Sequence, residues 1–239
     1  MFEMRKSEDR GVGKLDWLDA RFTFEFGPYK NPEQVGFSDL RLLNDDNVKG
    51  GGGFATHEHK DTEVFSYVIG GQLEHKDSMG HGSVVNPGDV LTMSAGSGIT
   101  HSEFNHSKAD PVHFLQICMV SGKKGITPTY NQKHFSEAEK RGKLRLIISP
   151  DGRDGSLTFV QDTKIYAGLF NGAEEDVVTL GPNRFAYVHV IRGSVSVNGQ
   201  LFGDGDGARV RHEEILTFSN GHDAEVLVFD MRPIERPEI

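Results

Sequence analysis

Residues 51–71 read GGGFATHEHKDTEVFSYVIGG, in which three glycines precede a histidine pair and a short apolar segment. His57 and His59 are two residues apart, and the apolar run 63–69 ends at two glycines, as a β-strand does at a turn. Because alternate residues of a strand point to the same face, both imidazoles are expected on one side of the chain. The stretch therefore predicts β-structure that presents a pair of metal ligands.

A second pair with the same spacing lies in residues 100–105 (THSEFN), where His101 and Glu103 are two apart. If the two strands lie close together in one barrel, His57, His59, His101 and Glu103 project into the same interior. Imidazole favours Fe, Ni, Cu and Zn, whereas Ca and Mg prefer all-oxygen ligands. The four side chains therefore predict a site for one transition-metal ion, with coordination positions left open for a substrate or dioxygen.

The rest of the chain predicts an all-β fold of two tandem β-barrels. Short strand-like runs recur with glycine punctuation, and residues 73–75 are expected to return from the turn at residues 70–71 as a hairpin. Residues 185–197, followed by Asn198-Gly199, repeat the pattern of the first half. The best helical candidate is 136–141, where Ser136 and Glu139 have capping-box spacing.

We expect an N-terminal barrel with the metal site in residues 1–122, a connecting segment in 123–155, and a C-terminal barrel in 156–239. Aligning Gly71 with Gly193 places Thr179 and Gly181 where His57 and His59 stand. The second barrel is therefore expected to lack a metal site.

Composition narrows the function classes. The formal charge of −9 argues against a nucleic-acid surface, and no apolar stretch is long enough to suggest a membrane helix. The charged N-terminal residues lack the pattern of a signal peptide, which favours a cytoplasmic protein. Cys118 is the single cysteine and lies in an apolar run, so we interpret it as a structural thiol. We expect a monomer, because closed barrels leave few free strand edges.

The glycines around the histidine pair carry a family resemblance. Gly51, His57, His59, Glu63 and Gly70 stand at the spacing of the first cupin motif, which this chain resembles throughout. The second motif matches less well: Ser94 stands where proline is usual, and the gap from Gly88 to His101 is longer.

Within the cupins, nearly the whole chain resembles the pirin family, especially its bacterial quercetinase-like members, which are bicupins. The stretches that carry this resemblance are 17–19 (WLD), 36–38 (GFS), 44–46 (NDD), 57–61 (HEHKD), 73–79 (LEHKDSM), 93–103 (MSAGSGITHSE) and 126–128 (ITP). The resemblance implies that His57, His59, His101 and Glu103 are the four ligands, that Glu63 is not one, and that the ion is Fe(2+), with Ni, Cu, Mn and Zn as alternatives.

Two functions follow from this resemblance. One is a quercetin 2,3-dioxygenase, which uses a flavonol and O2, releases CO, and employs Glu103 as both ligand and catalytic base. The alternative is a metal- or redox-sensing regulatory protein that binds a protein partner. A third possibility is a stress-related protein whose metal only stabilises the barrel. The other histidines considered, His75, His81, His106 and His113, are interpreted as structural, although His75 and His81 flank a loop that could border the mouth of the first barrel.

Overall fold

The computed structural model describes residues 1–237, which form two compact units. The first barrel comprises Gly11–His134 and Phe159–Gln161, together with the described residues from Arg236. The second barrel comprises Met1–Arg10, Phe135–Thr158 and Asp162–Glu235. Almost all regular structure in both units is β-strand, which confirms the predicted all-β class.

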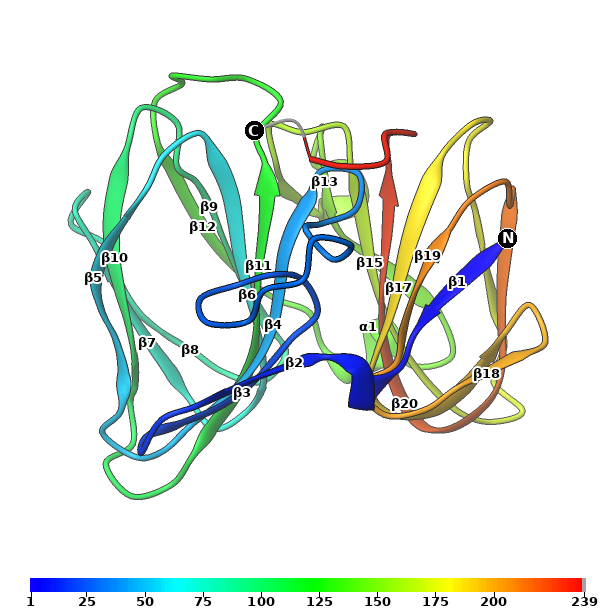
Figure 1. Cartoon of the computed structure of the whole chain (residues 1–239), viewed down its shortest axis with the longest axis horizontal. Helices are drawn as coiled ribbons and strands as arrows, with labels where there is room; N and C mark the ends of the chain where they lie inside the picture. Colours follow the sequence, from blue (N-terminus) through cyan, green and yellow to red (C-terminus); the bar gives the residue numbers. More distant parts are fainter. Residues whose placement is uncertain (238–239) are drawn as a thin grey trace. The chain divides into compact units, whose positions relative to one another are not determined.

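The first barrel is built from two antiparallel sheets that face each other (Figure 1). One sheet has the order β12-β9-β6-β11-β4-β3-β2, and the other has the order β5-β10-β7-β8. The strand bounds are β2 Gly11–Lys14, β3 Leu18–Phe22, β4 Leu40–Val48, β5 Gly53–His59, β6 Thr62–Gly70, β7 Leu73–Asp77, β8 Gly82–Val85, β9 Asp89–Ser94, β10 Ile99–Asn105, β11 Val112–Val120 and β12 Thr129–His134.

Alternation of side chains divides the interior of the first barrel into an apolar and a polar part. In β10, Ile99, His101, Glu103 and Asn105 are all buried, while the residues between them are more exposed. A cluster of apolar side chains fills one part of the interior; it includes Leu18, Phe22, Val68, Leu91 and Phe114. The inward positions of β10 at His101 and Glu103 are therefore held in a rigid, mostly dry environment.

The second barrel contains one sheet with the order β1-β19-β17-β20-β15-β13-β14, with β16 paired to β20 and β18 paired to β17. Its elements are β1 Phe2–Arg5, a 3₁₀ turn Ser7–Asp9, α1 Glu137–Lys140, β13 Leu144–Ser149, a 3₁₀ turn Arg153–Gly155, β14 Leu157–Thr158, β15 Lys164–Gly172, β16 Asp176–Thr179, β17 Phe185–Val197, β18 Gln200–Phe202, β19 Gly207–Val210 and β20 Ile215–Met231. The buried core is apolar and rich in valine, with Phe170, Phe202 and Phe218.

Two local predictions from sequence are confirmed. Ser136 precedes α1, and its backbone N–H donates to Glu139 Oε2 at 2.9 Å, which is half of the predicted capping box. Asn198 and Gly199 both have positive φ, 48° and 78°, and they join β17 to β18 as a tight hairpin.

The predicted hairpin after β6 is wrong. Strand β6 pairs with β9 and β11, whereas β7 pairs with β8 and β10, so the chain crosses from one sheet to the other at Gly71. Gly71 has a φ of 74°, and a Cβ there would lie 2.5 Å from the carbonyl oxygen of Pro111. The glycine thus serves a tight crossing between sheets, and glycine content alone does not distinguish that crossing from a hairpin.

The compact units also differ from the expected boundaries at 122 and 155. Strand β1 pairs with β19, so the first residues of the chain complete the second barrel. Strand β12 pairs with β9, which extends the first barrel to His134. Strand pairing between segments far apart in the sequence therefore determines to which barrel each end of the expected N-terminal domain belongs.

Within residues 1–237, the structure contains no helix long and apolar enough to cross a membrane.

Candidate metal centre

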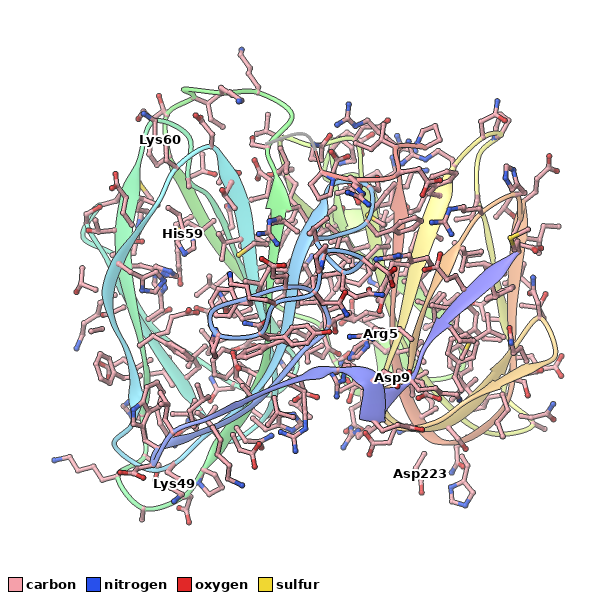
Figure 2. The ribbon with its side chains drawn as sticks, in the orientation of Figure 1. Arg5, Asp9, Lys49, His59, Lys60 and Asp223 are labelled. Carbon is pink, nitrogen blue, oxygen red and sulfur yellow. The ribbon has the colours of Figure 1, made fainter. Side chains whose placement is uncertain are left out.

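The strands β5 and β10 pair side by side and bring the two predicted ligand pairs together. His101 lies opposite His57, and Ile99 lies opposite His59. The register shifts between His101 and Glu103, so a bulge re-aims the chain between these two side chains. Figure 2 shows His59 extending from β5 toward the barrel interior, whereas Lys60 lies beyond the end of that strand.

The three histidines form a compact group. Their ring centroids are 5.0 Å apart for His57 and His59, 4.5 Å for His57 and His101, and 4.9 Å for His59 and His101. The group offers one ligand atom per residue, with all three atoms within 4.8 Å of one another. His101 is buried and His57 is the most exposed of the three, so the group is accessible from one side.

Hydrogen bonding orients the Nε2 atom of His57 toward that of His101. The Nδ1–H of His57 donates to the carbonyl oxygen of Ala55 at 2.9 Å, which leaves the Nε2 lone pair free. His59 Nε2 is buried and has no hydrogen-bond partner among the described residues. His57 Nε2 and His101 Nε2 are 3.0 Å apart. Two nitrogens each about 2.1 Å from one ion and at right angles to each other are about 3.0 Å apart, so the arrangement fits a bound cation.

The surroundings also keep the imidazoles of His59 and His101 neutral. Burial, together with the neighbouring His57, lowers the pKa of His59 to about 4. Burial, together with the neighbouring His59 and His57, lowers the pKa of His101 to about 2. Since a neutral imidazole is the form that binds a metal, these two residues are ready to act as ligands at neutral pH.

Glu103 lies next to this group and has a defined orientation. Its Oε2 is 4.0 Å from His101 Nε2, and it forms a second, overlapping group of possible ligands with His101 and His75. The Ser66 hydroxyl donates to Glu103 Oε1 at 2.8 Å, and Ser66 also lies 2.9 Å from the side-chain amide of Gln116. The Ser66 hydroxyl has a single proton, and it faces two acceptors, Glu103 Oε1 and Gln116 Oε1.

Burial raises the pKa of Glu103 to about 7, although the Ser66 hydrogen bond acts in the opposite direction. A cation beside Glu103 favours the charged carboxylate and lowers that pKa again.

A second buried acid, Asp46, has an Oδ1 with no hydrogen-bond partner within residues 1–237. Burial and the nearby Asp45 and Glu103 raise the pKa of Asp46 to about 8. A negative charge in the interior beside the histidines is therefore unfavourable unless a bound cation compensates it.

Glu63 is separate from the histidine group. It is buried and receives hydrogen bonds from the hydroxyls of Ser94 and Ser121. It belongs to neither group of possible metal ligands found in the described part of the chain. Glu63, the glutamate of the first cupin motif, therefore has a structural role as a hydrogen-bond acceptor.

His75 is a residue that sequence reasoning missed. We interpreted it as structural, with the barrel mouth as a possible location, but it is completely buried on β7, and its Nδ1 is 3.4 Å from His101 Nδ1. Its Nε2 is 3.2 Å from Asp77 Oδ2. The sequence does contain a feature that could have identified His75, because His75 and Asp77 have the same two-residue spacing as the two ligand pairs. However, nothing in the sequence shows that β7 pairs with β10. His81, by contrast, has a partly exposed side chain.

Comparison with known proteins identifies the fold as a double cupin and then the family. Residues 4–119 match the family described as Pirin, and residues 146–231 match the quercetinase C-terminal cupin domain. A protein named quercetin 2,3-dioxygenase from Escherichia coli (strain K12) is 40% identical over 234 residues, covering 98% of this chain and 100% of the relative. The chain belongs to the pirin family.

Other relatives agree with this assignment. A putative quercetin 2,3-dioxygenase from Pasteurella multocida is 33% identical and a pirin-like protein from Caulobacter vibrioides is 30% identical, with 97% and 96% of this chain and 100% and 99% of the relatives covered. The crystal structure of the bacterial pirin YhhW from Escherichia coli in complex with nickel(II) superimposes with a TM-score of 0.93 at 39% identity, covering 98% of this chain and 100% of that one. The nickel-bound relative and the histidine group together support a site for a divalent metal.

Proposed function

We propose that this protein is a metal-dependent dioxygenase that cleaves quercetin or a related flavonol with dioxygen and releases carbon monoxide. The observation that carries the proposal is the group of three imidazole nitrogens, with Glu103 beside it, in a member of the pirin family. Relatives that match over nearly the whole chain bear the name quercetin 2,3-dioxygenase. Its partners in this proposal are a small aromatic substrate and O2.

The proposed ligands are His57, His59 and His101 through their Nε2 atoms, with Glu103 through Oε2. When bound, a divalent transition metal supplies a positive charge and open coordination positions for the flavonol oxygen and for dioxygen. Fe(2+) is our first candidate, and Ni(2+) follows because a relative of known structure holds nickel. The exposed side of His57 offers the substrate an approach to this point.

Glu103 is proposed as the base that removes the 3-hydroxyl proton of the flavonol. Ser66 donates to Oε1 and fixes the carboxyl group, so Oε2 would be the oxygen that accepts the proton, and its coordination to the metal would have to be weak or displaceable. Burial raises the basicity of the carboxylate, whereas a bound cation lowers it. In the overall reaction both atoms of O2 enter the cleaved product, and one carbon of the flavonol leaves as CO.

The test is to load the protein with Fe(2+), and in parallel with Ni, Mn, Cu and Zn, and to follow quercetin absorption and CO release. We expect turnover with at least one metal and none in His101→Ala. Glu103→Gln keeps the contact with Ser66 but loses the proton acceptor and the carboxylate ligand, so kcat should fall by roughly a hundredfold or more even at metal concentrations that saturate the three histidines. Stoichiometric metal binding without turnover of quercetin or other flavonols would overturn the dioxygenase proposal.

A further inference from the structure

The buried side of His101 is occupied by a chain of hydrogen-bonding groups that leads away from the candidate metal centre. His101 Nδ1 faces His75 Nδ1 at 3.4 Å, and His75 Nε2 faces Asp77 Oδ2 at 3.2 Å. The side chains of His75 and Asp77 are both completely buried. All three residues lie on the paired strands β7 and β10, with His101 opposite Asp77 in the register.

The carboxylate at the end of this chain determines where each proton lies. Asp77 accepts hydrogen bonds, so the nitrogen of His75 that faces it, Nε2, must carry the proton. His75 Nδ1 then has a lone pair, and it can only accept from His101. His101 must therefore carry its proton on Nδ1 and present an Nε2 lone pair to the interior.

The opposite end of the group is fixed in the same way. Ala55 accepts the Nδ1–H of His57, so the Nε2 lone pair of His57 points at that of His101, 3.0 Å away. Two lone pairs at this distance repel each other, and a cation between them removes the repulsion. The same two protons that fix the tautomers thus make the site favour a cation over an internal hydrogen bond.

Further contacts hold the chain in place. Asp77 Oδ1 accepts the backbone N–H groups of Met79 and His81 at 2.9 and 3.1 Å, so Oδ2 is turned toward His75. The ring nitrogen Nδ1 of His81 lies 3.0 Å from the same Oδ2 and holds the carboxylate from its other side. The ring of Tyr130 stacks between the rings of His75 and His81, with centroid distances of 5.2 and 4.6 Å. Ring rotation of His75 would break both the stack and the hydrogen bond to Asp77.

We propose that His75 and Asp77 are positioning residues that lock His101 in the Nδ1–H tautomer and so pre-organise its Nε2 for a divalent cation. Neither residue touches the ion or the substrate in this proposal. The inference rests on the proposed metal centre, and it adds a second layer of residues to it. Partners of this kind behind a metal-binding histidine typically change metal affinity by about 10- to 100-fold.

The direct test is nitrogen NMR of the full chain labelled with ¹⁵N-histidine and loaded with Zn(2+), which is diamagnetic. Long-range proton–nitrogen correlations should show His101 as the Nδ1–H tautomer and His75 as the Nε2–H tautomer. A wild-type His75 that carries its proton on Nδ1 would overturn the proposal. This measurement needs no variant and no turnover.

Variants separate the hydrogen bond from packing. His75→Phe keeps the ring that stacks on Tyr130 but removes the acceptor, so Zn(2+) affinity should fall by about 10- to 100-fold. His75→Asn loses the ring but can offer an oxygen near the position of Nδ1, and it should retain affinity within about threefold. Equal affinities for wild type and His75→Phe would show that the chain does not prepare the site.

Asp77→Asn gives the sharpest comparison because it is isosteric. The two backbone N–H groups hold its oxygen, so its NH2 faces His75 Nε2 and reverses the tautomer of His75. Two N–H groups then face each other between His75 and His101, and Zn(2+) affinity should fall as in His75→Phe. His222→Phe, the matched control, changes an exposed histidine of the second barrel and should bind Zn(2+) as the wild type does. If the wild type itself binds no divalent metal, the metal centre fails, whereas unchanged variants on a metal-binding wild type overturn only the positioning role.

Discussion

The two barrels use similar strand patterns but fill equivalent interior positions differently. Ser66 and Val188 each lie five residues before a glycine that ends the same pattern, Gly71 and Gly193. Across the sheet, Ser66 pairs with Gln116, whereas Val188 pairs with Val228. Ser66 holds Glu103 in place, and both valines belong to the apolar core.

The comparison continues one strand further. Gln116 pairs with Asn44 in the first barrel, and Val228 pairs with Tyr166 in the second. A row of hydrogen-bonding side chains in one barrel thus corresponds to a row of mostly apolar side chains in the other. Buried polar groups destabilise a fold unless their hydrogen bonds are satisfied. We therefore attribute the polar row to its role in positioning Glu103, and the apolar row to packing of the core.

The largest effect on stability is expected when a polar side chain of the first barrel is introduced at the equivalent apolar position of the second barrel. Val188→Ser removes buried methyl groups and leaves a hydroxyl among apolar side chains, so the free energy of unfolding should fall by about 3 kcal/mol. Metal binding should not change. Denaturant unfolding and metal titration of the same sample measure the two quantities. A variant as stable as the wild type would mean that the second core accommodates polar groups and that the contrast has no energetic basis.

The reciprocal change tests the polar row. Ser66→Val removes the donor to Glu103 Oε1, a hydrogen bond to a charged group that is worth about 1.5 kcal/mol, so metal affinity should fall about tenfold. Isothermal titration with Zn(2+) measures this, and Ser66→Thr, which retains a hydroxyl, is the matched control. Similar affinities for Ser66→Val and wild type would show that Ser66 does not contribute to metal binding.

The smallest effect concerns Asp46, whose pKa is raised to about 8 in the folded protein from an ordinary value of 3.8. The folded state keeps this proton while the unfolded state loses it, so the metal-free protein loses stability as pH rises from about 4 to 8. Asp46→Asn has no such proton, and its stability relative to wild type should increase by about 1.4 kcal/mol for each pH unit within that range. Thermal melts of metal-free protein at pH 5 and pH 6 measure the difference over one pH unit. A constant difference between the two proteins would contradict the raised pKa.

Some of these features were predictable because they depend on local spacing. The pairs His57 and His59, and His101 and Glu103, share a face through the two-residue period of a strand, and the capping box of Ser136 follows from a three-residue spacing. The three histidines do meet as expected, and Glu103 lies beside His101.

Other features depend on which strands pair, and local spacing does not contain that information. The Gly70-Gly71 turn predicts a hairpin, but β7 joins the other sheet and pairs with β10. That pairing is also what buries His75 against His101, so one wrong inference about a turn hid a functional candidate. The expected boundary at residue 122 failed to anticipate the pairing of β12 with β9 for the same reason.

The pairing of β1 with β19 has a consequence for the order of folding. Phe2 lies opposite Val210, and Lys6 forms a 2.7 Å ion pair with Asp206. During synthesis the first strand leaves the ribosome about two hundred residues before its partner, so it must wait through the synthesis of every strand of the first barrel. Closing so long a loop is slow, and completion of the second barrel is therefore a late event that requires two segments about two hundred residues apart.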